Sequence, residues 1–219
     1  MTRGRFITLE GGEGAGKSAQ GRRLAARLRG LGLEIVATRE PGGTPHAEAL
    51  RALILSGALR EQGPAAEAIA FSAARIDHID ALIRPALARG AWVVCDRFAD
   101  STRAYQGAAG RLAPLFVDRL EEVVVGADRP DLTLLLDLRP EQGLARATAR
   151  RGGAEGADRF ESEGLEFHRT LRAAYLAIAR AAPERCVVID ASEDEESVGE
   201  AVWAAVRSRL GADLPRPPP

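Results

Sequence analysis

Residues 6–18 read FITLEGGEGAGKS, and this stretch decides the fold prediction. Its first part, Phe6 to Leu9, is short and rich in β-prone residues, so we expect a strand. Residues Gly11 to Ser18 match the phosphate-binding motif G-x-x-x-x-G-K-[ST] at every fixed position, and a long helical pattern follows. Because strand, loop and helix come in this order, we interpret the stretch as a phosphate site rather than a glycine-rich hairpin or linker.

Each residue type in this loop suits the binding of a nucleotide phosphate. Glycines let the backbone turn its N–H groups toward phosphate oxygens with no Cβ in the way. Lys17 would neutralise charge on the β- and γ-phosphates, Ser18 would ligate Mg²⁺, and the following helix points its positive end at the anion. The predicted nucleotide-binding residues are those of the whole loop: Gly11, Gly12, Glu13, Gly14, Ala15, Gly16, Lys17 and Ser18.

The composition is that of a soluble globular protein. A length of 219 residues suits one large domain, and 46% apolar with 28% charged residues is ordinary for such a domain. A formal net charge of −1 argues against a dedicated nucleic-acid surface. We find no apolar run long enough for a membrane span and no signal-peptide core, and we expect a cytoplasmic protein with Cys95 and Cys186 as buried thiols.

Strand-like and helical segments alternate along the chain. This order predicts an α/β fold with a five-stranded parallel sheet and helices on both faces. Ligands bind such sheets at the carboxyl ends of the strands, so we expect the loop, Arg39, Asp96 and Arg97 along one rim. The predicted strands are Phe6 to Leu9, Ile35 to Thr38, Ala91 to Cys95, Leu132 to Leu138 and Val187 to Ile189.

Several local signals predict where helices begin and end. Thr44 and Pro45 form a helix start, Pro85 should break or kink a long helix, and Ser192 with Glu195 has the pattern of a capping box. We expect residues 1–212 to form the single domain and 213–219 to be a disordered proline-rich tail. The small, charged segment 150–161 is a candidate mobile lid.

Absent motifs weaken other classes of phosphate-loop protein. The chain has no asparagine and no D-x-x-G, so it lacks the usual guanine clamp and switch of a GTPase. It also lacks an insert or basic arm suited to a nucleic-acid motor. An ATPase that activates water stays open, because Glu10, Glu13 and Asp96 offer acidic groups. Several arginines near the rim favour a small-molecule kinase, since guanidinium groups bind phosphate oxygens bidentately.

Longer segments resemble bacterial thymidylate kinases, which belong to the P-loop nucleoside monophosphate kinases. TREPGGT (38–44), FSAAR (71–75) and CDRFADSTRAYQG (95–107) are similar to family motifs, and PDLTLLLD (130–137) and DRFE (158–161) follow in the family's order. Phe98 and Ser18 replace residues that are more common there. The resemblance implies transfer of the γ-phosphate of ATP to dTMP, with Mg²⁺, a P-loop kinase fold and a homodimer.

The resemblance also implies roles for individual residues. Lys17 and Mg²⁺ would hold the donor, and Ser18 and Asp96 are the predicted metal ligands. Because Glu13 stands where some members have arginine, the charge at the transferred phosphoryl group would come from the lid, with Arg150, Arg151 and Arg159 as candidates. The predicted catalytic residues are Lys17, Arg97, Arg151, Arg159 and Glu10.

The same resemblance implies an acceptor site. Arg97 would clamp the acceptor phosphate with help from Arg51, while Glu10 and Glu40 would orient the sugar 3′-OH, the phosphate or metal waters. Phe71 would stack on thymine with Arg75 at its O4 side, Thr102 and Gln106 would bind the imide, and Tyr105 would crowd C2′ and disfavour ribonucleotides. Kinases for dUMP or UMP, and an ATP-dependent switch protein, remain alternatives. The predicted substrate-binding residues are Glu40, Arg51, Phe71, Arg75, Arg97, Thr102, Tyr105 and Gln106.

Overall fold

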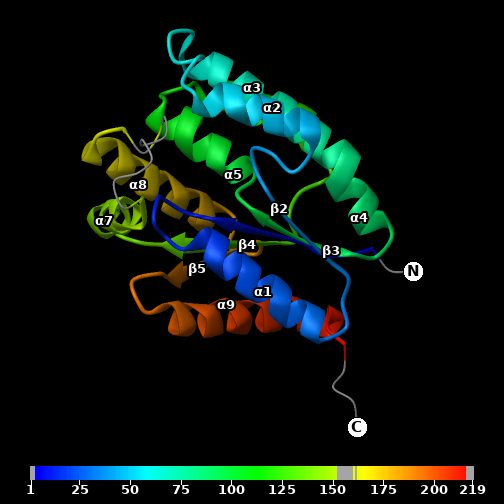
Figure 1. Cartoon of the computed structure of the whole chain (residues 1–219). Coiled ribbons are helices and arrows are strands. Elements are labelled where there is room, and N and C mark those ends of the chain that lie inside the picture. Colours follow the sequence, from blue (N-terminus) through cyan, green and yellow to red (C-terminus); the bar gives the residue numbers. More distant parts are fainter. Residues whose placement is uncertain (1–2, 152–159, 161, 216–219) are drawn as a thin grey trace.

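The computed structural model describes residues 3–151, 160 and 162–215. In these residues five parallel strands form one sheet in the order β2-β3-β1-β4-β5, with helices on both faces (Figure 1). The α/β fold expected from the alternating segments is therefore confirmed. The strands are β1 (Phe6–Glu10), β2 (Ile35–Arg39), β3 (Trp92–Asp96), β4 (Leu132–Asp137) and β5 (Cys186–Asp190).

The helices divide between the two faces of the sheet. Helices α1 and α9 cover one face, and α2, α3 and α4 lie on the opposite side (Figure 1). The α-helices are α1 (Lys17–Gly30), α2 (Pro45–Leu55), α3 (Gly63–His78), α4 (Arg84–Ala88), α5 (Ala99–Thr102), α6 (Pro114–Val124), α7 (Pro140–Arg151), α8 (Leu165–Ala181) and α9 (Glu195–Leu210). Two π-helical segments, η1 (Ile79–Ile83) and η2 (Arg103–Ala109), and a 3₁₀ turn, η3 (Gly211–Asp213), complete the described elements.

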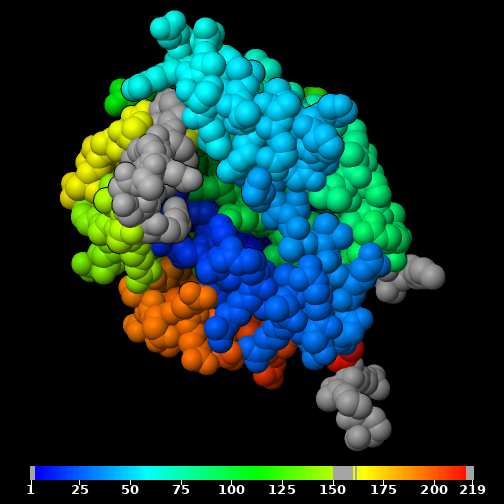
Figure 2. All heavy atoms as spheres, viewed as in Figure 1, coloured from blue at the N-terminus to red at the C-terminus, as the bar shows by residue number. Residues whose placement is uncertain are grey.

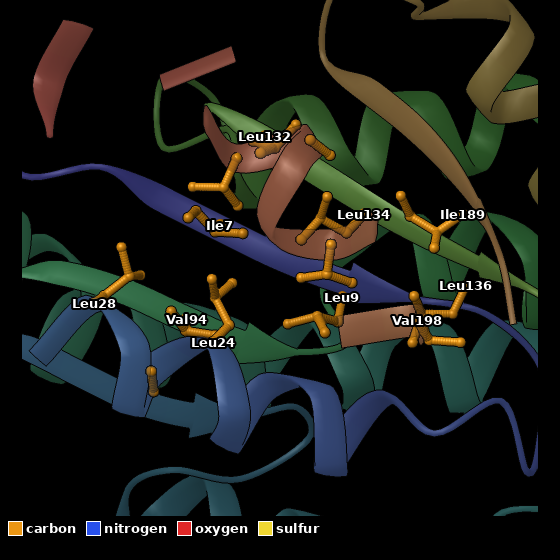
Figure 3. Packing of buried hydrophobic residues seen from close by; sticks show 14 of the residues in the cluster. Ile7, Leu9, Leu24, Leu28, Val94, Leu132, Leu134, Leu136, Ile189 and Val198 are labelled. Atoms are coloured by element: carbon orange, nitrogen blue, oxygen red, sulfur yellow. The ribbon is translucent and has the colours of Figure 1, made fainter. Parts of the chain in front are cut away.

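The largest hydrophobic cluster lies between the sheet and the α1/α9 layer. Ile7 and Leu9 of β1 meet Leu24 and Leu28 of α1 there, and Leu134 joins from β4 (Figure 3). Their neighbours in β1 point to the other face, which is also covered, so every residue of the strand is buried. Burial on both faces explains why the three central strands, β1, β3 and β4, are nearly uninterrupted apolar runs. Each fully buried side chain of this kind contributes roughly 1.5–3 kcal/mol.

The register of the sheet gathers the candidate residues at one edge. Asp96 of β3 pairs with Leu9 on one side and with Arg39 on the other. Glu10 follows Leu9, and the phosphate-binding loop continues directly from it. The ends of three neighbouring strands therefore meet where the loop begins, as the alternating pattern predicts.

The start of α2 agrees with the sequence prediction. Thr44 is its N-cap, with a hydroxyl that accepts a hydrogen bond from the Ala47 amide at 3.2 Å, and Pro45 is the first helical residue.

One boundary prediction is wrong. The N-cap of α9 is Asp194 rather than Ser192, and its carboxylate accepts from the Glu196 and Ser197 amides at 2.9 Å. The long helical stretch that Pro85 was predicted to break or kink is divided into α3, η1 and α4, and Pro85 lies in the first turn of α4, where a proline N–H is not required. The π-helical segment η1 precedes it.

The first residues of the predicted tail contact the domain. Asp213 accepts a hydrogen bond from Arg5 at 2.9 Å, and Leu214 packs against the main cluster. Residues 216–219 lie outside the described part of the chain. Among the described helices, none has both the length and the apolar character that crossing a bilayer requires.

Candidate active site

The phosphate-binding loop is shaped by glycines and by close contact with α7. Gly14 and Gly16 have φ values of 67° and 88°, which side chains rarely adopt. A Cβ on Gly14 would lie 2.0 Å from the carbonyl oxygen of Gly143, and a Cβ on Gly143 would lie 2.2 Å from that of Glu13. The loop therefore packs backbone to backbone against the first turns of α7.

Helix α1 begins at this loop with its amide groups open to an anion. Its N-cap, Gly16, provides no side-chain cap, and the first turn holds no acidic residue. Lys17 lies there with its Nζ 2.7 Å from the carbonyl oxygen of Gly12. Burial, with the nearby charge of Arg97, lowers the pKa of Lys17 to about 8 against the opposing effect of Glu13. The loop thus gathers a cation and a helix N-terminus, which together suit a polyphosphate.

Arg97 is the central cation of the site. It follows β3 with a φ of 70°, a left-handed conformation that is uncommon for residues other than glycine and often occurs at functional positions. Its Nη1 donates to the Gly11 carbonyl at 3.1 Å, and its Nη2 donates to Glu13 Oε1 at 2.6 Å and to Tyr105 Oη at 2.9 Å. These contacts fix the guanidinium above the phosphate-binding loop.

Glu13 is the anionic partner of Arg97. Its Oε1 also accepts a hydrogen bond from the Tyr105 hydroxyl at 2.6 Å. Burial alone would raise the pKa of Glu13, but Arg97 and Lys17 outweigh it and lower the pKa to about 2. Glu13 therefore stays ionised over the whole physiological range.

Glu10 does not lie on the surface of the site. It is buried, and its two oxygens accept hydrogen bonds from the Phe98 amide at 2.7 Å, from Ser101 Oγ at 2.6 Å and from Tyr175 Oη at 3.1 Å. Burial and the charge of Asp100 raise its pKa to about 7. The geometry thus makes Glu10 a support for the Arg97–Phe98 turn, whereas the sequence predicted contact with sugar, phosphate or metal waters.

A cavity of about 530 Å³ opens over these groups. Figure 2 shows this face of the molecule hollowed between the blue residues around the loop and the cyan residues of α2 and α3. The volume is within the usual range for a small-molecule site. The sequence-predicted residues that line it are Glu13, Gly14, Gly16, Lys17, Ser18, Glu40, Arg51, Phe71, Arg75, Asp96, Arg97, Thr102, Tyr105 and Gln106.

The end of the cavity away from Lys17 carries polar groups beside an aromatic ring. Arg75 of α3 is buried, and its Nη1 and Nη2 donate to Thr102 Oγ1 at 3.2 and 3.1 Å. Its Nη2 also donates to the Phe98 carbonyl at 3.2 Å. Phe71 lies one turn earlier on α3, and Gln106 comes from η2. These groups suit a flat heterocycle with hydrogen-bonding edges.

The Glu40 carboxylate is a partner of Arg75 and His78 rather than a free group in the cavity. Its Oε2 accepts from Arg75 Nε at 2.7 Å, and its Oε1 lies 3.0 Å from His78 Nδ1. His78 is fully buried, and its Nε2 lies 2.8 Å from Thr38 Oγ1. Both carboxylate oxygens of Glu40 are therefore engaged by protein, although the sequence predicted contact with sugar, phosphate or metal waters.

Arg51 and Tyr105 also take part in contacts within the protein. Arg51 Nη1 donates to the Pro41 carbonyl at 2.7 Å on the cavity wall. The Tyr105 ring lies under the Arg97 guanidinium at 5.0 Å and meets the ring of Phe160 edge-on at 5.2 Å. Burial is the largest cause that raises the pKa of Tyr105, so its hydroxyl stays protonated.

Comparison with known proteins identifies the family. The sequence profile described as Thymidylate kinase matches residues 9–202, which include the loop, Arg97 and the cavity-lining segments.

The chain belongs to the thymidylate kinase family.

Relatives and a solved structure agree with this assignment. A thymidylate kinase of Bradyrhizobium diazoefficiens is 54% identical over 215 residues, covering 98% of this chain and 92% of the relative. A thymidylate kinase of Rhodopseudomonas palustris is 56% identical over 209 residues, covering 95% and 90%. The crystal structure of thymidylate kinase from Ehrlichia chaffeensis shares 29% identity with a TM-score of 0.76, over 93% of this chain and 99% of that one. The chain is thus a nucleoside monophosphate kinase of this family.

The thymidylate kinase family implies Mg²⁺, and the residues at the loop fit it. The Ser18 hydroxyl donates to Asp96 Oδ2, so a hydroxyl and a carboxylate meet beside Lys17. Both are oxygen donors, as Mg²⁺ prefers. The described residues contain no group of three or more His, Cys, Asp and Glu that could enclose a metal.

Three predicted arginines cannot be placed against the site. Arg159 lies outside the described residues, and for Arg150 and Arg151 the structure describes only the backbone of α7. Their roles stay predictions.

The structure adds site residues that the sequence did not reveal. Ser101 and Phe160 line the cavity, and Tyr175 of α8 donates to Glu10 and contacts Arg97 from 78 positions along the chain. A tyrosine on an amphipathic helix looks like core packing from sequence alone. Glu67, which accepts a hydrogen bond from Gln106, could have been suspected from the sequence. It lies four residues before Phe71 and therefore on the same side of α3.

Proposed function

We propose that this thymidylate kinase transfers the γ-phosphate of ATP to dTMP, giving ADP and dTDP on the route to dTTP. Family membership supports the reaction, and the cavity provides one end for a polyphosphate and another for a base. The observation that carries the proposal for the acceptor is the arrangement of Arg75, Thr102 and Gln106 around one end of that cavity.

ATP phosphates would bind the loop amides, the N-terminus of α1 and Lys17. Bound Mg²⁺, held by Ser18 and Asp96, would supply charge neutralisation at the β- and γ-phosphate oxygens. The Ser18–Asp96 contact supports this pairing of ligands. Lys17 already lies against the loop, so its positive charge is in place without a conformational change.

Arg97 would clamp the acceptor phosphate. A phosphate monoester has a second pKa of about 6, so its attacking oxygen is already anionic near neutral pH. A general base is therefore not required, and the barrier lies in bringing two polyanions together. Arg97 suits this task because its guanidinium is fixed above the loop by contacts with Gly11, Glu13 and Tyr105.

The hydrogen-bonding groups at the far end match a thymine. Arg75 donates from Nε to Glu40, from Nη2 to Phe98 and Thr102, and from Nη1 to Thr102. Because Nη1 carries two hydrogens, one of them has no acceptor among the described residues. That hydrogen would go to O4 of the base, while Thr102 and Gln106 would serve the imide edge. Phe71 would stack on the ring, and Tyr105 would crowd the sugar C2′.

Steady-state kinetics tests the proposal. ATP consumption should depend on dTMP, and kcat/KM should fall when dTMP is replaced by ribo-TMP or dUMP. A higher kcat/KM for dUMP or UMP than for dTMP would show that this nucleotide, and not dTMP, is the acceptor. Equal ATP turnover without any nucleotide acceptor would instead support a switch protein that uses hydrolysis.

We also propose a homodimer through α3 and α6, which pack side by side. Ile69 and Ile76 of α3 are 55% and 45% exposed, and Leu115 and Val123 of α6 are 67% and 82% exposed. Adjacent exposed apolar side chains of this kind commonly mark protein contacts. Val123→Glu should yield monomers by light scattering, whereas Val188→Glu, at an exposed position of β5, should leave the dimer intact.

Cytoplasmic location is the matching proposal for the compartment. Cys95 and Cys186 are both buried free thiols, which suits a reducing environment. Fractionation of the source cells would test it.

A further inference from the structure

A buried acidic residue lies directly behind the predicted base-binding amide. Gln106 Nε2 donates to Glu67 Oε2 at 3.3 Å, and the two residues are 2% and 4% exposed. Gln106 lines the cavity, whereas Glu67 does not. Glu67 is therefore connected to the cavity lining through this hydrogen bond to Gln106.

The geometry of α3 aims Glu67 at this position. Glu67, Phe71 and Arg75 follow one another at intervals of four residues, so they lie on one stripe of the helix. Phe71 and Arg75 face the cavity, and Glu67 continues their line to where η2 packs against the helix. The stripe thus combines two residues that would touch the base with one that touches its neighbour.

The chemistry of the pair fixes which way the Gln106 amide points. Glu67 Oε2 accepts from Gln106 Nε2, so the amide presents its NH₂ group to Glu67. The opposite orientation would set two buried acceptors against each other, which costs the loss of a hydrogen bond and adds repulsion. With its Nε2 turned to Glu67, the amide has its carbonyl oxygen on the opposite side, and Gln106 lines the cavity. We infer that this oxygen would accept from a donor on a ligand.

We propose that Glu67 is a positioning residue that locks the Gln106 amide with its carbonyl oxygen toward the base, and so selects bases with a ring N3–H. This inference rests on the proposed dTMP kinase function. Thymine and uracil carry a hydrogen on N3 and a carbonyl at C4, which pair with Gln106 Oε1 and an Arg75 N–H. Cytosine has an acceptor at N3 and an amino group at C4. It would therefore place an acceptor against Gln106 Oε1 and a donor against the Arg75 N–H.

Kinetic discrimination between dTMP and dCMP tests the role of Glu67. The variant Glu67→Gln keeps the size of the side chain but can donate as well as accept, so it no longer dictates the amide orientation. We expect the ratio of kcat/KM for dTMP to that for dCMP to fall by roughly tenfold or more. The control Glu61→Gln, at an exposed position just before α3, should leave the ratio unchanged. An unchanged ratio in folded Glu67→Gln would overturn the proposal.

A double-mutant cycle separates positioning from general damage. Gln106→Leu removes the amide, so adding Glu67→Gln to it should change the dTMP/dCMP ratio no further. An equal effect of Glu67→Gln in both backgrounds would show that Glu67 acts by another route. Should Glu67→Gln fail to fold, Glu67→Asp, which keeps the charge but shortens the reach, replaces it with the same expectation.

Wild-type kinetics keeps this inference separate from the function on which it rests. If the wild-type protein does not phosphorylate dTMP, the proposed function is refuted. If the wild type and the Glu67→Gln variant are equally selective for dTMP over dCMP, only the inference about Glu67 is refuted.

Discussion

Arg97 donates from Nη2 to Glu13 Oε1 at 2.6 Å, and the pair spans the cavity from the end of β3 to the phosphate-binding loop. Arg97 therefore has a negative partner from its own chain within the cavity, which offsets the cost of burying its charge. In the proposed mechanism the acceptor phosphate would be a second anion at the same guanidinium.

Loss of the Arg97 guanidinium should disable the acceptor site. We expect Arg97→Ala to lower kcat/KM for dTMP by at least roughly a hundredfold, since it removes a fixed charge next to the transferred group. Arg97→Lys should recover only part of the loss, because lysine lacks the bidentate fork. The matched control is Arg89→Ala, an exposed arginine paired with Glu34 away from the cavity. Wild-type kcat/KM in Arg97→Ala would remove Arg97 from the mechanism.

Binding of ATP to the free enzyme should weaken above pH 8. Burial lowers the pKa of Lys17 to about 8, so the charge that attracts the phosphates is present below this pH and lost above it. Between pH 8 and 9 the charged fraction falls several-fold, and the Kd for ATP from calorimetric titration should rise by about fivefold. Lys17→Arg, whose charge does not titrate there, should show a flat profile. A constant wild-type Kd from pH 7 to 9 would contradict the assignment.

Stability should fall as pH rises through the titration of Glu10. Burial raises its folded pKa to about 7 from 4.5, so the folded state binds more protons between these values than the unfolded chain. The stabilisation is full below about pH 4.5 and lost as pH passes 7, an effect of roughly 3 kcal/mol. Urea unfolding of Glu10→Gln, which keeps an acceptor for the Phe98 amide, should show a smaller decline between pH 5 and 8. Parallel curves for both proteins would refute this.

Removal of the Asp96 carboxylate should weaken the response to Mg²⁺. We expect Asp96→Asn to need about tenfold more free Mg²⁺ for half-maximal activity at saturating ATP and dTMP, because a neutral amide binds the ion more weakly. Asp80→Asn, at an exposed residue paired with Arg84, serves as the control. Identical Mg²⁺ curves for wild type and Asp96→Asn would exclude Asp96 as a ligand.

Arginines of the predicted lid should act on turnover rather than on affinity. Arg151→Ala or Arg159→Ala should lower kcat by roughly a hundredfold or more while the Kd for ATP changes little, as expected for charge that serves the transition state. Arg22→Ala, which removes an exposed arginine at the mouth of the cavity, gives a comparison within the same site. Undiminished kcat in both lid variants at saturating substrate would end this assignment.

Local chemistry made most of the fold predictable. The central strands β1, β3 and β4 were found because parallel strands buried on both faces are short apolar runs. The start of α2 was found because Thr44 and Pro45 have fixed roles there. The cap of α9 was misplaced by two residues, since Ser192 and Asp194 are both good caps and only the path of the chain chooses between them. The π-helical segments left no sequence signal at all.

The site was predictable where a residue lines the cavity and not where a residue's role depends on a partner distant in sequence. The loop and most cavity-lining residues lie in short motifs, so the residues next to them in sequence make them recognisable. Glu10 and Glu40 lie in those motifs too, but their partners Tyr175 and His78 are distant in sequence. Only the folded chain reveals that these two carboxylates support arginine-bearing segments.

The absence of side chains where Gly14 meets Gly143 has a mechanical consequence. With a hypothetical Cβ only 2.0 Å from the opposing backbone, any residue larger than glycine at position 14 would push the phosphate-binding loop and the first turns of α7 apart. The spacing between the nucleotide cradle and this helix is therefore set by two residues without side chains, and a single added methyl group at either one would widen it.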